Sequence, residues 1–241
     1  MHQLQNFCES FERVGVHEIK LRNLLELRDP ENDLRVIKTM FPPIELGSIT
    51  LVDQIILLTL VELSNPERIL EIGTYRGYST RLFVTNSRAK EIVTVDLPTV
   101  QSGPRAPVDA QRLLKDGDYN DDYLRALQNI TGPRYLSDLE PAERDRVKLI
   151  KCDSTSLNFR KYIGPIQFAF IDGGHSYDIV RQDTANVLSQ IESGIIVWHD
   201  YSSAIHSDVT RFLGEYSEDN QLFYVHGGLC AFQLIRGSLR G

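Results

Sequence analysis

The feature that most constrains the fold is the alternation of short β-rich runs with helical stretches from residue 65 onward. Five runs combine apolar and β-branched residues: Arg68–Ile72, Glu91–Val95, Val147–Cys152, Gln167–Ile171 and Gly194–Trp198. Helical patterns follow the first and fourth runs, near Ser79–Ser87 and Tyr177–Ile191. Strands that alternate with helices form a parallel sheet covered on both faces. The sequence therefore predicts an α/β protein.

The end of the chain predicts a different strand connection. Two further runs, Gln221–Val225 and Leu229–Ile235, flank the turn residues Gly227 and Gly228. Two strands joined by a tight glycine turn form a hairpin. We therefore expect the last strand to run antiparallel to its neighbour.

The chain before residue 65 predicts a helical extension. A helix of mixed polarity is expected around His17–Leu27 and an apolar helix over Leu51–Leu63, with Ser48 or Thr50 as its cap. We therefore divide the chain into an extension, residues 1–64, and a main domain, residues 65–241.

One long connection separates the second and third expected strands. Residues 97–146 are rich in Pro, Gly, Asp and Arg, and a helix is expected around Asp121–Asn129. Long connections in compact domains are usually functional or mobile. We expect this segment to leave the sheet at its ligand-binding edge and to act as a lid over the substrate.

Composition excludes several classes of protein. The 241 residues suit one large domain, and the net charge of −7 argues against non-specific binding to nucleic acid or anionic membranes. Cys8, Cys152 and Cys230 are too dispersed for a disulfide framework or a structural zinc site. The N-terminus is too polar for a signal peptide, and Ile55–Val61 is too short an apolar run to cross a bilayer. We therefore expect a cytoplasmic protein.

A glycine loop after the first run predicts a ligand site. Gly73 and Gly77 lie between this run and the next helix, whose free N–H groups attract anionic groups. Asp96 follows Gly73 by 23 residues and ends the second run, where an acid accepts hydrogen bonds from ribose hydroxyls. Asp153 ends the third run and is placed to bind an adenine amino group. Together these residues predict a nucleoside pocket.

The motif ILEIGTYRGYST, followed by VTVD, KCDS, FIDGGHSY and GIIVWHDY, resembles the class I S-adenosylmethionine-dependent methyltransferases. The resemblance covers roughly residues 49–236 and extends to the macrocin O-methyltransferase-like subgroup, which acts on small molecules in antibiotic and sugar pathways. It implies a Rossmann-like, doubly wound sheet of seven strands with the last antiparallel. Glu71 and the glycine loop would hold the methionine end, Asp96 the ribose and Asp153 the adenine. The full set expected at the cofactor is Glu71, Gly73, Tyr75, Gly77, Ser79, Asp96, Asp153, Ser154 and Asp172.

Two acids at the ends of the fourth and fifth runs predict the reaction site. Asp172 and Asp200 should converge because their strands are expected to be neighbours, and two carboxylates suit Mg²⁺ or Mn²⁺. Such an ion would lower the pKa of an acceptor hydroxyl and orient it. In metal-dependent relatives such as catechol O-methyltransferase, a second acid follows the first by 28 positions and an amide comes next. Asp200 matches this spacing, whereas Tyr201 departs from the pattern.

His199 and His175 are the neighbouring groups that bear on the chemistry. His199 can share the site of Asp172 and Asp200 as a third metal ligand only if its strand has already ended. His175 lies in a glycine-flanked loop beside Asp172 and is expected to act as the general base, in a reaction in which Asp172 also takes part. The alternative is that His175 bonds a neighbour such as Asp183 and only shapes the loop.

We expect transfer of a methyl group to a hydroxyl of a small molecule such as a sugar or polyketide. N-methylation and a non-catalytic cofactor-binding module stay open as alternatives. A nicotinamide oxidoreductase is disfavoured because Tyr75 stands where its motif requires a second glycine beside the pyrophosphate. The oligomeric state stays open, and a homo-oligomer is one alternative because helical extensions in the family often pack between subunits.

Overall fold

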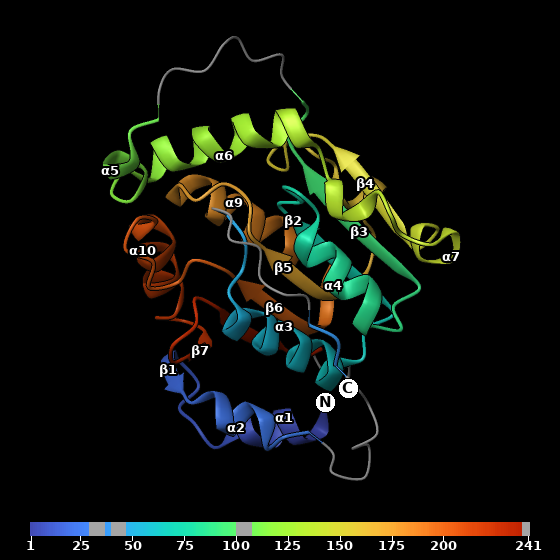
Figure 1. The fold of residues 1–241 in the computed structure, drawn as a ribbon. Helices are drawn as coiled ribbons and strands as arrows, with labels where there is room; N and C mark the ends of the chain where they lie inside the picture. The colour runs from blue at the N-terminus through green and yellow to red at the C-terminus, as the bar shows by residue number, and fades with distance from the viewer. Residues whose placement is uncertain (29–36, 40–46, 100–107, 238–241) are drawn as a thin grey trace.

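A single eight-stranded sheet forms the centre of the computed structural model, which describes residues 1–28, 37–39, 47–99 and 108–237 (Figure 1). Its order is β1-β7-β8-β6-β5-β2-β3-β4. The strands are β1 (Gly15–Ile19), β2 (Arg68–Ile72), β3 (Glu91–Asp96), β4 (Val147–Lys151), β5 (Ile166–Ile171), β6 (Ile191–Trp198), β7 (Gln221–Val225) and β8 (Ala231–Ile235). Only β8 runs antiparallel to its neighbours, β6 and β7. The predicted α/β class, the five parallel runs and the antiparallel last strand are confirmed.

The expectation of seven strands is wrong by one, because the N-terminal extension contributes β1. This strand pairs in parallel with β7, from Gly15 opposite Gln221 to Ile19 opposite Val225. The expected helix over His17–Leu27 is correspondingly wrong at its start, and only α2 (Leu21–Leu25) is helical. Pairing with the open edge of β7 outweighs the local helical preference of the segment.

Helices cover both faces of the sheet (Figure 1). The apolar side chains of α1 (His2–Glu9), α3 (Leu51–Ser64) and α4 (Tyr78–Asn86) pack into one core cluster, and those of α8 (Phe159–Tyr162), α9 (Tyr177–Leu188) and α10 (Ser207–Tyr216) into the other. Thr50 caps α3 by accepting a hydrogen bond from a backbone N–H of the first turn, as predicted. The two clusters fix the sheet between layers of helices.

The described part of the long connection between β3 and β4 is largely helical. It contains α5 (Ala110–Leu113), α6 (Gly117–Thr131), the 3₁₀ helix η2 (Arg134–Leu136) and α7 (Pro141–Arg144), and residues 100–107 lie outside it. The helix expected at Asp121–Asn129 is thus longer than predicted. Figure 1 shows α6 across the edge of the sheet at which β2, β3 and β4 end. The connection therefore covers the edge at which the predicted site residues lie.

The strand order places a switch point beside β2. From β2 the chain continues to β3 and β4 on one side, whereas β5 and β6 lie on the other. In open α/β sheets, ligands bind outside the carboxyl ends of the strands at such a point. Among the described residues, every helix falls short of the length and apolar character that crossing a bilayer requires.

Candidate active site

A cavity of about 630 Å³ opens at the carboxyl ends of the central strands, between them and α6. Most of the predicted site residues line it: Gly73, Tyr75, Asp96, Asp153, Ser154, Asp172, His175, His199 and Asp200. These residues follow five different strands, so their side chains meet only because the strands are parallel and in register. The cavity volume is within the range of small-molecule and cofactor sites.

The glycine loop fits tightly between β2 and β5. Gly73 has a φ of 101°, and a Cβ atom at this position would lie 1.8 Å from the backbone oxygen of Asp172. Gly77 caps α4 with a φ of 81°, and its Cβ would lie 2.6 Å from a carbon of Leu136. Both positions need glycine for its backbone conformation and for the close approach. Gly73 and Tyr75 line the cavity and Gly77 does not, so the expected contact of Gly77 with the cofactor stays a prediction.

Glu71 and Ser79 lie beneath this loop and do not line the cavity. The Glu71 carboxylate is fully buried and accepts hydrogen bonds from the hydroxyls of Ser79, Thr80 and Thr94. Burial raises the pKa of Glu71 to about 7, against the effect of these three donors. Glu71 and Ser79 hold β2, β3 and α4 together under the loop, and their expected contact with the cofactor stays a prediction.

Asp96 and Asp153 end β3 and β4 on the cavity wall. Asp96 accepts hydrogen bonds from Lys151 Nζ at 2.8 Å and from the Gln128 side chain of α6. Burial raises the pKa of Asp96, and the Lys151 ion pair opposes this. Asp153 Oδ1 accepts hydrogen bonds from the backbone and hydroxyl of Thr155. Helix α6 thus contacts the carboxylate that was expected to bind a ribose.

Asp172 and Asp200 converge as predicted, and the ring of His199 lies between them. His199 Nδ1 is 3.3 Å from Asp172 Oδ1 and 3.1 Å from Asp200 Oδ2. Strand β6 ends at Trp198, so His199 and Asp200 no longer alternate across the sheet. Asp200 has a φ of 60°, a left-handed conformation that is costly for a non-glycine residue. This backbone turn brings the two adjacent side chains to one site.

His175 joins the same cluster from the loop after β5. Its Nε2 is 3.1 Å from Asp200 Oδ2 and 4.0 Å from Asp172 Oδ1. On its other side, Nδ1 lies 2.8 Å from Asp121 Oδ1 of α6, and the ring stacks on that of His206 at 3.8 Å. The partner on this side is Asp121, and the alternative of a bond to Asp183 is not observed.

The two histidines and the two aspartates of this cluster shift one another's pKa values. Burial opposes the charged form of both His175 and His199, but the surrounding carboxylates raise both pKa values well above the usual value. Burial likewise opposes ionisation of Asp172 and Asp200, but the charge of His199 and the hydrogen bonds of both rings hold their pKa values below the usual range. The cluster therefore favours carboxylates around protonated imidazoles.

The donor set fits a divalent cation. Asp172, His175 and Asp200 each offer one ligand atom, and these atoms lie within 4.8 Å of one another. The Nε2 atoms of His175 and His199 are buried and make no hydrogen bond of good geometry within the described residues. Carboxylate oxygens and imidazole nitrogens suit Mn²⁺, Fe²⁺ or Zn²⁺ better than they suit Mg²⁺.

Sequence reasoning missed three polar residues that contact the predicted ones. Asp121 and Gln128 come from α6, and nothing in the local sequence marks them, because their roles depend on how the long connection folds back. Asp53 of α3 is fully buried and lies 3.6 Å from His199. A single acid in the first turn of an otherwise apolar helix is a signal that could have identified Asp53.

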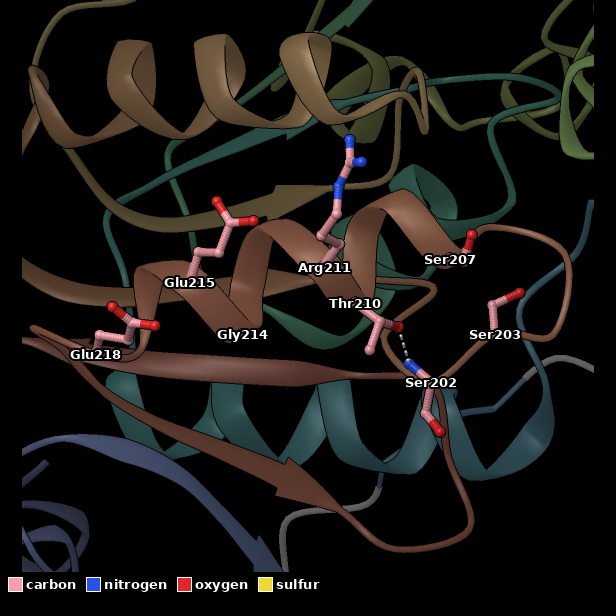
Figure 2. A pocket seen from close by; sticks show the side chains of 8 residues that line it. All are labelled: Ser202, Ser203, Ser207, Thr210, Arg211, Gly214, Glu215 and Glu218. Atoms are coloured by element: carbon pink, nitrogen blue, oxygen red, sulfur yellow. Dashed lines mark hydrogen bonds between the residues drawn. The ribbon is translucent and has the colours of Figure 1, made fainter.

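A second hollow lies on the outer side of α10 (Figure 2). It is an open groove of about 680 Å³, along which Arg211 and Glu215 project from the helix. Thr210 Oγ1 accepts a hydrogen bond from the Ser202 backbone at 2.8 Å and ties the preceding loop to α10. None of the predicted site residues line this groove, so it is separate from the cavity.

The fold and the cavity together define the class of protein. A doubly wound sheet with an antiparallel last strand, a glycine loop after its central strand and acids at successive strand ends is the arrangement of a class I methyltransferase. A family model described as a methyltransferase domain matches residues 70–201, more than half of the chain. The chain belongs to this methyltransferase family, which confirms the resemblance read from the motifs. No curated protein matches the sequence.

Solved structures share the fold at low sequence identity. One is a methyltransferase from Podospora anserina bound to S-adenosylhomocysteine, with 17% identity and a TM-score of 0.53 over 98% of this chain and 95% of that one. Another is the O-methyltransferase TomG from Streptomyces achromogenes in complex with S-adenosylmethionine, with 16% identity and a TM-score of 0.53 over 90% and 89%. The O-methyltransferase NovP has 14% identity and a TM-score of 0.50 over 74% and 76%. At these low identities, the similarity to the three structures shows a shared fold and nothing beyond it.

Proposed function

We propose that the protein transfers a methyl group from S-adenosylmethionine to a hydroxyl of a small molecule such as a sugar or polyketide. The observation that carries this proposal is the single cavity in which Gly73, Asp96 and Asp153 meet Asp172 and Asp200. S-adenosylmethionine supplies a methyl group that its sulfonium already activates. The remaining work of the protein is to bind, orient and deprotonate the acceptor. The solved O-methyltransferases TomG and NovP share the fold and support the proposal.

The cavity divides into a donor half and an acceptor half. We assign the methionine end to the loop of Gly73, Tyr75 and Gly77, and the ribose to Asp96. Asp153 and Ser154 are assigned to the adenine because they lie on the next strand end along the cavity wall. Glu71 and Ser79 support the loop from below, and Asp172 lies where the donor half meets the acceptor half.

The acceptor half contains the proposed chemistry. His175 faces Asp172 and Asp200 and is assigned as the group that takes the acceptor proton. Because the surrounding carboxylates raise the pKa of its ring, His175 must release its own proton before it takes that of the acceptor, while the contact with Asp121 holds the ring in place. Asp172 is assigned to orient the acceptor hydroxyl.

We assign Asp172, His199 and Asp200 as the residues that would hold a divalent cation, Mg²⁺ or Mn²⁺. Such an ion supplies Lewis acidity, which lowers the pKa of a hydroxyl and stabilises the alkoxide that develops. His199 Nδ1 lies within 3.3 Å of both carboxylates, which supports this assignment. The buried Nε2 of His175, which makes no hydrogen bond of good geometry within the described residues, faces the same two acids from the other side.

A cytoplasmic location and a homo-oligomeric state stay predictions, as does the division into residues 1–64, 65–241 and a lid at 97–146. Cys8, Cys152 and Cys230 are free thiols, which suits a reducing compartment. Among the possible partners, the cavity suits a small-molecule methyl acceptor.

We expect Asp96→Ala to weaken S-adenosylhomocysteine binding at least tenfold in calorimetry, from a dissociation constant in the micromolar range or tighter. The loss corresponds to a charge-assisted hydrogen bond of about 1.5–3 kcal/mol. Glu67→Ala is the matched control, because Glu67 pairs with Lys90 at the surface before β2 begins. Unchanged affinity in Asp96→Ala would remove the ribose assignment. Binding of NAD or NADP in place of S-adenosylhomocysteine would overturn the methyltransferase proposal.

We expect α6 to exchange its amide hydrogens faster than β2 and β5 in the free protein. When cofactor and acceptor bind, Gln128 and Asp121 must adjust to groups at Asp96 and His175, and α6 should become protected. Hydrogen exchange followed by mass spectrometry measures this change peptide by peptide. Equal protection of α6 in both states would identify the connection as a rigid insertion.

A further inference from the structure

Helix α3 brings a buried carboxylate to the back of the acceptor half. Asp53 is fully buried, and its Oδ1 accepts a hydrogen bond from the backbone of Leu229 at 2.7 Å. Its Oδ2 accepts one from the Thr50 hydroxyl at 2.7 Å. The two bonds fix the carboxylate between α3 and the turn of the β7–β8 hairpin.

The ring of His199 lies between this carboxylate and the cavity. Nε2 is 3.6 Å from Asp53 Oδ2, while Nδ1 faces Asp172 and Asp200. Nε2 is buried and makes no hydrogen bond of good geometry within the described residues. A buried N–H requires an acceptor, and an approach of about 0.7 Å brings Asp53 to ordinary hydrogen-bond length.

Cys230 is the other polar side chain beside this nitrogen, and together with Asp53 and His199 it forms a compact group. Its thiol is fully buried. The sulfur of a thiol is a weak hydrogen-bond acceptor compared with a carboxylate oxygen. Asp53 is therefore the better partner for Nε2.

We propose that Asp53 is a positioning residue that accepts the Nε2–H of His199 and thereby directs Nδ1 towards the divalent cation held with Asp172 and Asp200. The inference rests on the cation assigned under the proposed function. A ligating histidine usually donates its other ring N–H to a carboxylate or carbonyl, which fixes the tautomer and the direction of the ring. Asp53 lies outside residues 70–201, so the N-terminal extension would take part in building the site.

Asp53→Asn tests the proposal, because the amide keeps the size of the side chain. With its oxygen on the Leu229 N–H, its NH₂ group faces His199 and cannot accept the Nε2–H. We expect Mn²⁺ affinity, measured by electron paramagnetic resonance on protein saturated with S-adenosylhomocysteine, to fall 10- to 100-fold. Binding of S-adenosylhomocysteine itself should change less than twofold. Cys230→Ala, which leaves the carboxylate in place, should keep Mn²⁺ affinity within threefold of the unmodified protein.

A second measurement needs no variant at Asp53. In protein labelled with ¹⁵N-histidine and loaded with Zn²⁺, the His199 ring should carry its proton on Nε2, with the signal assigned by its loss in His199→Gln. A proton on Nδ1, or unchanged Mn²⁺ affinity in Asp53→Asn, would overturn the proposal. Absence of Mn²⁺ binding to the unmodified protein would also overturn it, whereas intact S-adenosylhomocysteine binding and methyl transfer would show that the proposed function survives.

Discussion

Gly73→Ala is expected to abolish detectable cofactor binding and to lower the melting temperature by about 6–12 °C. The new Cβ would lie 1.8 Å from the Asp172 carbonyl oxygen, and the φ of 101° is one that L side chains rarely adopt. Backbone strain and overpacking of roughly 1–3 kcal/mol each add to roughly 2–6 kcal/mol, and we take about 3 kcal/mol because the backbone around the new Cβ can relax. At roughly 2–4 °C per kcal/mol for a chain of this size, that gives the expected shift.

The clash should also displace the residues that follow β2 from those that follow β5. Gly73 and Asp172 follow β2 and β5, which are hydrogen-bonded neighbours at the switch point, so relief of the clash must separate the donor half from the acceptor half. Gly214→Ala is the control, because this exposed position in α10 has no atom within 4 Å of the new Cβ and should gain up to about 1 kcal/mol. Differential scanning fluorimetry and calorimetry measure the two effects. A Gly73→Ala protein that melts normally and binds S-adenosylhomocysteine would contradict the proposed role of the loop.

The central strands could be predicted from sequence because they are buried on both faces. β2, β3 and β5 read as short runs rich in apolar and β-branched residues, and the structure places each within one residue of the expected bounds. The meeting of Asp172 and Asp200 was also predictable. Both acids follow parallel strands, and the register pairs Ile171 with Trp198, so residues just beyond these positions must lie at the same edge.

The edge strand β1 and the contacts between helices and the sheet could not be predicted in the same way. β1 is a strand only because β7 offers it an unpaired edge, a partner some 200 positions away along the sequence. The motif gave Glu71 a role at the ligand, whereas three hydroxyls from α4 and β3 hold it beneath the loop. Asp121 and Asp53 reach the two histidines through the packing of α6 and α3. Local sequence carries little information about such contacts.

Asp172→Asn is expected to lower kcat by a factor of about one hundred or more while S-adenosylhomocysteine affinity stays within threefold. The carboxylate faces His199 and His175, and an amide ligates a hard cation less well and orients an acceptor hydroxyl less strongly. The proposed donor contacts lie mainly on the ends of β2, β3 and β4 and should be preserved. Asp138→Asn, which removes the charge of an exposed acid paired with Arg81, is the control and should leave kcat unchanged.

Chelation separates the two ways in which this cluster could act. If Asp172, His199 and Asp200 hold a cation, excess EDTA should abolish turnover and leave cofactor binding nearly intact, and Mn²⁺ should restore activity better than Mg²⁺ because an imidazole contributes to the donor set. Full activity in EDTA, with loss of activity in His175→Ala, would instead favour a metal-free reaction with His175 as base. In that case His199 would serve as the buried counter-charge of Asp53, Asp172 and Asp200, since it contacts all three carboxylates.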